Sequence, residues 1–260
     1  MYKERGDKML ILKIMMVIGF IFMITLNVLA NTIPLNNKTT GQISDQYDNL
    51  FTPAGATFSI WGVIYLLLSL ILIYFLFKPN SYFEIQTHMN IAFLMISLSF
   101  FNGIWIVLWH YDKIFLSLIV MIFMLTTLGI LFTIIPSQEI LLKITMSIYF
   151  GWISVAMIAN VAVLLTKYQF KGFGIPPVYW LIVILFIGVL LSLLVLFYTR
   201  NTVYVFVIIW AYLGILMRHI SLTDWNKAYP LAIYSLIGFL VILVNATLFT
   251  FFKNDFKLYL

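Results

Sequence analysis

Cysteine is absent from all 260 residues, and charged residues are scarce. Without cysteine the chain has no disulfide, no thiolate nucleophile and no iron–sulfur or cysteine-bound zinc site. Only 9% of the residues are charged, and no Asp or Glu lies within the long apolar runs. Since acid–base catalysis and ion coupling inside a membrane use carboxylates, the sequence disfavours hydrolytic chemistry and a proton-coupled carrier.

Motifs for metals and nucleotides are also missing. The chain has no zinc-ligand spacing and no glycine-rich phosphate loop. Its histidines, His88, His110 and His219, fall at expected helix ends. One of them is a candidate axial haem ligand, but we expect them to be solvated at the membrane interface. The net charge of +6 is spread over loop ends, which indicates anchoring to anionic headgroups rather than binding to nucleic acid.

Apolar residues dominate what is present. They make up 63% of the chain, and its mean hydropathy is +1.07, which is typical of an integral membrane protein. Runs of about 20 apolar residues predict transmembrane helices, and their lack of period-2 alternation excludes a membrane β-barrel. The fold class is therefore all-α, with about eight spans. These are Leu10–Ala30, Thr57–Phe77, Asn90–Trp109, Ile114–Ile135, Ile140–Leu164, Val178–Phe197, Thr202–Ile220 and Pro230–Phe252.

The positive charges predict an orientation. With eight spans, nine of the 15 lysines and arginines fall on the side of the two termini and six on the other side. This places both termini in the cytoplasm of a multi-pass cell-membrane protein. The basic start and the Val28–Ala30 segment also fit a cleaved signal peptide, although we expect the first helix to be retained.

Two loops are longer than simple connectors. Residues 31–56 are polar and rich in Asn, Thr, Gly and Pro, so we expect them to form a lid over a membrane cavity. Residues 166–177 carry two glycines and a Pro-Pro pair, which end one helix and delay the next. This second loop predicts a division into a five-helix bundle, residues 1–170, and a three-helix membrane extension, residues 171–260.

Three expected helices each carry an aromatic and polar face. Positions i, i+3 and i+7 lie on one side of a helix. Such spacing joins Phe58, Trp61 and Tyr65 in one helix and Asn102, Trp105 and Trp109 in another. In the stretch "IYFGWISVAMIAN" it joins Tyr149, Trp152, Ala156 and Asn160. Aromatic rings beside a few amides suit a flat, mostly apolar ligand.

Packing without a ligand accounts for these faces equally well. Tryptophans at span ends, here Trp109, Trp180 and Trp225, fit the interfacial aromatic belt. Trp152 and Asn160 instead lie within a span, where an amide needs a partner. That partner is either another helix, through an interhelical hydrogen bond, or a pocket.

The motifs resemble those of the tryptophan-rich sensory protein family (TspO/MBR), relatives of the translocator protein. Residues 148–160 are similar to the family pattern P-Y-x-x-W-x-x-F-A-x-x-x-N, with Ile148 and Val155 in place of its proline and phenylalanine. Asn102 and Trp105 match a second family motif, N-x-x-W. Matches to a third motif, which follows a proline pair, are Pro53, Phe58, Trp61 and Tyr65.

The resemblance covers about residues 9–166 and implies a five-helix bundle with a pocket for tetrapyrroles such as protoporphyrin or haem, or for sterol-like ligands. It also implies a sensory or regulatory role. The candidate ligand-binding residues are Trp61, Tyr65, Asn102, Trp105, Tyr149, Trp152, Ala156 and Asn160. Porphyrin or haem is expected as a ligand and not as a required cofactor, and no catalytic or metal-ligating residue is assigned.

Three hypotheses follow. The leading one is a membrane receptor or binding protein for a flat hydrophobic ligand. A transporter or channel subunit for a hydrophobic small molecule is the second, and a porphyrin-degrading enzyme is the third. The expected partners are the lipid bilayer and a hydrophobic small molecule, with a homodimer left open and no nucleic acid.

Overall fold

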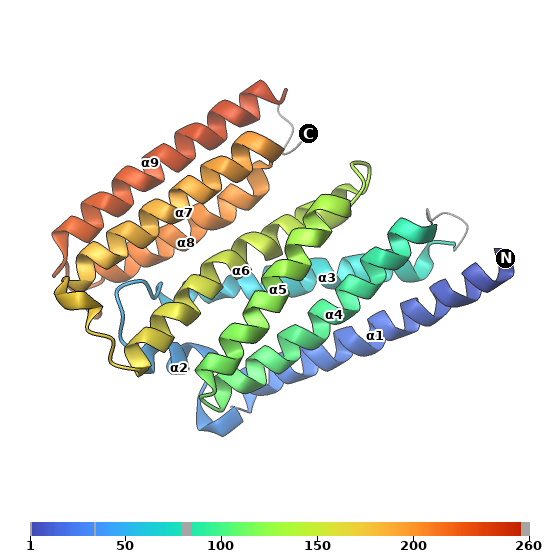
Figure 1. Ribbon diagram of the computed structural model, residues 1–260, viewed down its shortest axis with the longest axis horizontal. Helices are drawn as coiled ribbons and strands as arrows, with labels where there is room; N and C mark the ends of the chain where they lie inside the picture. The colour runs from blue at the N-terminus through green and yellow to red at the C-terminus, as the bar shows by residue number, and fades with distance from the viewer. Residues whose placement is uncertain (1, 34, 80–84, 256–260) are drawn as a thin grey trace. The chain divides into compact units, whose positions relative to one another are not determined.

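The computed structural model of the protein describes residues 2–33, 35–79 and 85–255. Throughout these residues the chain is helical and contains no strand, which confirms the all-α class. Figure 1 labels the long helices along the chain. They are α1 (Tyr2–Thr32), α3 (Ile60–Phe77), α4 (Ile85–His110), α5 (Ile114–Ile134), α6 (Ile140–Lys167), α7 (Pro177–Thr199), α8 (Thr202–Ile220) and α9 (Pro230–Lys253).

Eight helices of the described chain are long and apolar enough to cross a membrane, as predicted. The protein is therefore a multi-pass membrane protein whose helices contact the lipid bilayer. Most predicted ends agree with the helices to within a few residues, and α8 has the predicted bounds. The main difference is α1, which begins well before the predicted Leu10, because polar residues continue a helix beyond the apolar run.

Local sequence explains where the last three helices begin and end. Pro177 and Pro230 stand at the first helical positions of α7 and α9, where the missing N–H costs nothing. Arg200 ends α7 in the left-handed conformation with φ of 50°. Asn201 then caps α8, since its Oδ1 accepts a hydrogen bond from the Tyr204 N–H at 3.1 Å.

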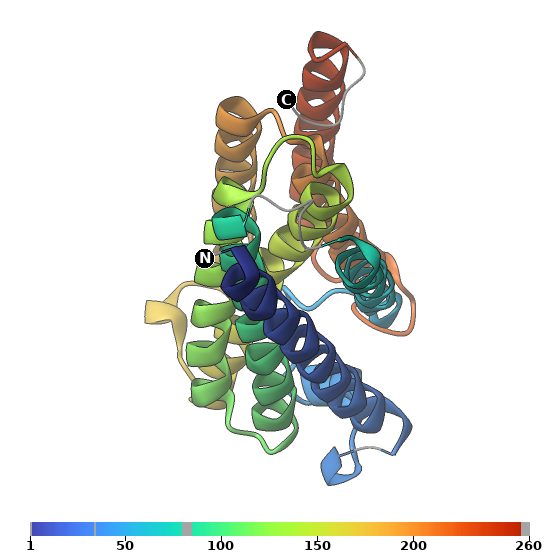
Figure 2. The same ribbon diagram turned by 90° about the vertical axis from the view of Figure 1, so that its right-hand side faces the viewer.

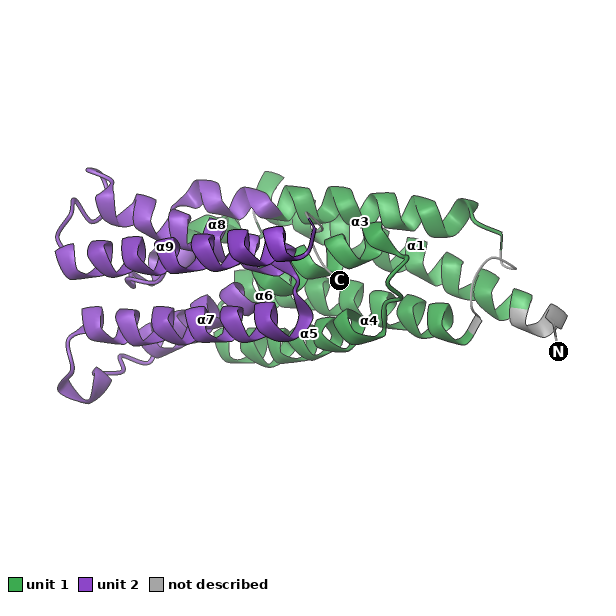
Figure 3. Cartoon of the chain, turned by 90° about the horizontal axis from the view of Figure 1, so that it is seen from above, with its two compact units in different colours: residues 1–43, 61–153 green, residues 44–60, 154–260 purple. Residues whose placement is uncertain are grey.

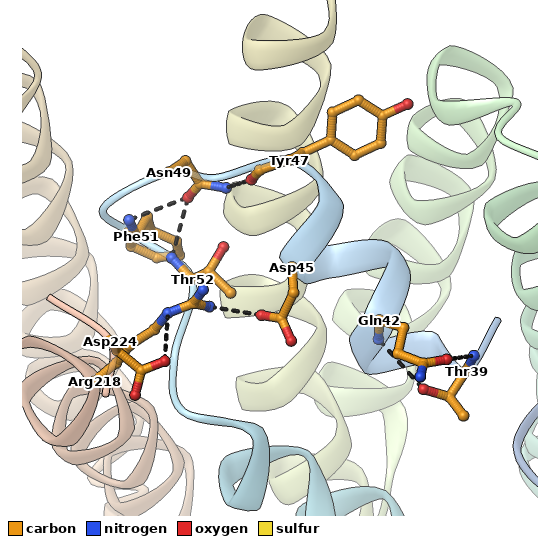
Figure 4. Close-up of polar contacts among 9 residues, drawn as sticks. All are labelled: Thr39, Gln42, Asp45, Tyr47, Asn49, Phe51, Thr52, Arg218 and Asp224. Atoms are coloured by element: carbon orange, nitrogen blue, oxygen red, sulfur yellow. Dashed lines mark hydrogen bonds and ion pairs between the residues drawn. The ribbon is translucent and has the colours of Figure 1, made fainter. Parts of the chain in front are cut away.

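The first long loop contains short helices. These are η1 (Leu35–Asn37), α2 (Thr40–Gln46) and η2 (Gly55–Ser59), and η2 leads directly into α3. A capping box starts α2: the Gln42 N–H donates to Thr39 Oγ1 at 3.3 Å, and the Thr39 N–H donates to Gln42 Oε1 at 2.8 Å. Figure 4 shows this reciprocal pair. Some of the polar residues of this loop therefore serve to cap a short helix.

The chain forms two compact units, coloured separately in Figure 3. The first unit consists of residues 1–43 and 61–153, and the second of residues 44–60 and 154–260. One boundary lies inside α6, and the segment before α3 belongs with the last three helices. The predicted division between residues 170 and 171 differs from these units and stays a prediction.

In the first unit α4 packs against both α1 and α5. Figures 1 and 2 both show α1, in blue, running alongside α4. A Cβ atom at Gly103 of α4 would lie 2.5 Å from Phe22 Cε1 of α1, so glycine allows this close approach. Near the start of α1, Lys13 Nζ donates to the Lys78 carbonyl at 2.7 Å.

In the second unit α7, α8 and α9 pack against one another. The most buried of the three helices is α8: 61% of its apolar 18-residue stretch is buried, against 28% in each of α7 and α9. Helix α8 is therefore the central helix of the three. The Tyr212 hydroxyl of α8 donates to the Leu185 carbonyl of α7 at 2.6 Å. After α9, Asn254 Nδ2 donates to the Arg200 carbonyl at 3.1 Å.

Candidate functional site

An aromatic cluster in the first unit is centred on Trp61. Its ring stacks on Tyr65 and Trp105, with centroids 5.5 and 5.7 Å away, and meets Tyr149 and Trp152 edge-on at 5.9 and 6.2 Å. Helical spacing aligns the rings, since Trp61 and Tyr65 are four residues apart on α3 and Tyr149 and Trp152 three apart on α6. Each aromatic pair stabilises the fold by about 0.5–1.5 kcal/mol beyond its buried area.

The cluster is buried on the α4 and α6 sides and more open at α3. Tyr149, Trp152 and Trp105 are between 0% and 5% exposed, whereas Trp61 and Tyr65 are only partly buried. The indole N–H of Trp105 is buried and has no hydrogen-bond acceptor among the described residues. Since buried donors are normally paired, this N–H is a free orienting group for a ligand or a water molecule.

A chain of hydrogen bonds supports the cluster from α1. Asn27 Nδ2 donates to Asn102 Oδ1 at 2.7 Å, and Asn102 Nδ2 donates to the Tyr149 hydroxyl at 2.8 Å. Asn27 Nδ2 also donates to the Met23 carbonyl at 2.9 Å. The chain thus joins α1, α4 and α6 through amides that would be costly to bury alone. Sequence reasoning missed Asn27, although it is the only amide within the first predicted span.

A small cavity lies beside this hydrogen-bonded chain. It has a volume of about 20 Å³, which is room for about one water molecule. Its lining is apolar and rich in methionine, a side chain that repacks easily. The lining residues are Met16, Phe20, Met23, Leu68, Leu72, Met95, Leu98, Ser99 and Tyr149. The cavity is therefore far smaller than an ordinary ligand pocket.

Six of the eight predicted site residues lie in the first unit. Five form the aromatic cluster, and Asn102 is hydrogen-bonded to one of its members. The other two, Ala156 and Asn160, lie further along α6 in the second unit, where Asn160 is 1% exposed. The role of all eight as ligand contacts stays a prediction.

Trp109 corrects the expectation of an interfacial tryptophan at the end of α4. It is 5% exposed, its ring stacks on Trp105 at 6.0 Å, and its Nε1 donates to the Thr40 carbonyl at 3.3 Å. The segment after η1 covers it, because Thr40 begins α2. Trp109 therefore extends the aromatic cluster. Its burial could have been predicted from the sequence, because Trp109 shares the i, i+3, i+7 face with Asn102 and Trp105.

The expectation of solvated histidines is wrong. His88, His110 and His219 are 4%, 1% and 0% exposed. His88 Nε2 lies 3.3 Å from Glu139 Oε1, and His110 Nδ1 lies 2.8 Å from the Ile106 carbonyl. Tertiary contacts therefore bury these rings at helix ends where hydropathy alone suggests water. No histidine lines the cavity, and the described residues contain no group of three or more metal-ligating side chains.

Comparison with known proteins identifies the family. Comparison with curated proteins and with solved structures gave no match. The model of the family described as TSPO-like protein matches residues 13–248. This match extends beyond residue 166, where the recognised motifs end, and takes in most of the last three helices. Because it covers nearly the whole chain, the protein belongs to the TSPO-like protein family.

Proposed function

We propose that the protein is a membrane receptor or binding protein for a flat hydrophobic ligand, of the tetrapyrrole or sterol type. The membrane-helix bundle and the family fit a membrane binding protein. The observation that carries the proposal is the contact of Trp61 with four aromatic rings within 5.5–6.2 Å. These rings offer stacking faces, and the Trp105 N–H offers an orienting hydrogen bond.

Binding of such a ligand requires side chains to move. Ligand pockets have volumes of about 300–1,000 Å³, whereas the cavity has about 20 Å³. The residues suit a flat ring as contacts, and the methionines Met16, Met23 and Met95 are the side chains best able to make room. Trp61 is partly exposed, so we propose that the ligand enters beside Trp61. There it would replace part of the stacking between Trp61 and the neighbouring rings.

The site would treat haem and metal-free protoporphyrin alike. Histidine is absent from both the cavity lining and the aromatic cluster, so neither supplies an axial nitrogen to haem iron. Recognition would then come from ring stacking and burial of apolar surface. The proposed role is sensory or regulatory, in the cell membrane with both termini in the cytoplasm.

A titration followed by tryptophan fluorescence tests the proposal. Haem and protoporphyrin should both quench the purified protein saturably and with similar dissociation constants. The double variant Trp61→Ala/Trp152→Ala should bind at least tenfold more weakly, since each lost aromatic stack weakens binding by about 1 kcal/mol or more. Trp180→Phe, in the second unit, is the control and should bind normally. An unchanged dissociation constant in the double variant would refute the proposed site.

A further inference from the structure

The segment before α3 is attached to α8 by two hydrogen bonds, one between backbone groups and one from a side chain of α8. The Ala54 N–H donates to the Gly214 carbonyl at 2.9 Å, and Trp210 Nε1 donates to the Thr57 carbonyl at 3.0 Å. Trp210 and Gly214 are one helical turn apart on α8. The segment therefore runs antiparallel to α8 and contacts one face of it.

One further turn along α8 the same face carries an ion pair. Arg218 Nη1 lies 2.9 Å from Asp45 Oδ1, and Arg218 Nε lies 4.0 Å from Asp224 Oδ1, as Figure 4 shows. Beside it His219 Nε2 donates to the Leu50 carbonyl at 3.0 Å. Arg218 and His219 are 8% and 0% exposed, whereas the side chains of Asp45 and Asp224 are 61% and 41% exposed, so the basic side chains are buried and their carboxylate partners face outward.

The segment is folded tightly between these attachment points. Asn49 Oδ1 accepts hydrogen bonds from the N–H groups of Phe51 and Thr52, both at 3.1 Å (Figure 4). Leu50, Phe51 and Thr52 are between 2% and 6% exposed. Residues 45–57 thus form an ordered segment of the second unit that is buried in its middle, at residues 50–53, and we call this segment the strap.

Glycine at position 214 is required where the strap meets α8. A Cβ atom built there would lie 2.7 Å from Thr57 Cγ2 and 2.9 Å from Thr57 Cβ, and would also overlap Thr57 Oγ1. Since real Cβ atoms do not approach so closely, any larger residue at 214 must displace Thr57. Position 214 therefore controls whether the strap lies against α8.

The strap is continuous with the helix that carries the central tryptophan. Thr57 lies in η2, which leads into α3 without an intervening residue, and Trp61 is the second residue of α3. Residues 55–77 form one uninterrupted apolar span. Thr57 therefore lies four residues before Trp61 on one continuous helical stretch.

From these contacts we infer that Trp210, Gly214 and Arg218 are positioning residues for the ligand site, because they hold the strap and thereby set the place of Trp61. The inference rests on the proposed function and assigns a role to the C-terminal helices. Their part is to fix the start of α3.

Gly214→Ala tests the inference, with Gly238→Ala as a matched control because a Cβ atom at Gly238 meets nothing within 4 Å. The chain has no cysteine, so Thr52→Cys introduces a single reporter in the strap. Gly214→Ala should speed maleimide labelling of this cysteine about tenfold, as expected when local opening loses one or two hydrogen bonds. Thr57→Gly in the Gly214→Ala background removes the overlap and should restore slow labelling.

The position of Trp61 is read without ligand by ¹⁹F NMR of fluorotryptophan-labelled protein, with its resonance assigned by Trp61→Phe. This resonance should shift in Gly214→Ala and return on adding Thr57→Gly. Protoporphyrin affinity should fall about three- to tenfold in Gly214→Ala and recover with the second change, a range equivalent to one or two lost contacts. Trp210→Phe, which deletes only the N–H bond to Thr57, should show smaller shifts in the same direction.

The outcomes separate the two proposals. Unchanged labelling in Gly214→Ala would overturn the strap. Faster labelling with an unmoved Trp61 resonance would overturn the positioning role. A moved resonance in a protein whose wild type binds no porphyrin would support positioning and refute the proposed function alone.

Discussion

Replacing Asn102 with leucine should destabilise the protein measurably. Asn102 is fully buried and makes two interhelical hydrogen bonds, at 2.7 Å from Asn27 and at 2.8 Å to Tyr149. Such bonds inside membrane proteins contribute about 0.6 kcal/mol each on average and at most about 1.7 kcal/mol. Because leucine has a similar size, the loss in free energy of unfolding should be about 1–3 kcal/mol and should come mainly from these bonds.

A double-mutant cycle assigns the energy to the bond itself. Tyr149→Phe removes only the hydroxyl that Asn102 donates to, so it should cost about 0.6 kcal/mol, and the double variant should cost less than the sum of the two. The coupling energy, which is the difference between that sum and the loss in the double variant, should equal the free energy that this one hydrogen bond contributes. The two side chains are joined by the hydrogen bond from Asn102 Nδ2 to the Tyr149 hydroxyl, and this bond is what the coupling energy measures.

Unfolding in mixed micelles of increasing SDS content, followed by far-UV circular dichroism, measures these free energies. Ser97→Ala is the control, since Ser97 is half-buried on the same helix and its hydroxyl bonds only to the Phe93 carbonyl of that helix, so the change should alter stability by less than about 0.5 kcal/mol. A stability of Asn102→Leu equal to the wild type, or fully additive losses in the double variant, would refute the proposed support of the aromatic cluster.

Three further predictions concern other residues. Trp105→Phe should leave the free energy of unfolding within about 1 kcal/mol of the wild type, because the indole N–H has no acceptor among the described residues, yet weaken porphyrin binding in the fluorescence titration. Glu139→Leu should lower that free energy by about 1–3 kcal/mol, since it leaves buried His88 without its carboxylate 3.3 Å away, whereas a loss near zero would argue against this pair. Single cysteines at the exposed positions Lys113 and Asp255 should be labelled from outside and inside the cell respectively; labelling from the same side would contradict eight spans.

Length and apolarity were enough to predict the spans. A helix must satisfy its backbone within lipid, so charges and prolines beside an apolar run indicate its ends, as Lys113 and Pro136 do for α5. Helical periodicity likewise predicted that Trp61, Trp105 and Trp152 each lie on an aromatic and polar face of a helix, and the structure brings their rings together. Both predictions depend only on residues near each other in the chain.

Features that depend on distant residues could not be predicted in this way. Trp109 and His219 are buried by Thr40 and Leu50, which lie 69 and 169 residues away in sequence. The same holds for the strap, since its attachment to Gly214 leaves no periodic pattern in either segment. Hydropathy and spacing report which face of a helix is buried, and the identity of the covering segment comes only from the folded chain.

The aromatic cluster around Trp61 is the proposed ligand site. Equilibrium titration of the purified wild-type protein with protoporphyrin, beside the variant Trp61→Ala/Trp152→Ala, tests it most directly. We expect saturable binding to one site per chain that is weakened at least tenfold in the variant, consistent with the loss of two stacking faces of about 1 kcal/mol each. Binding that never saturates, or that is equally tight in both proteins, would contradict it.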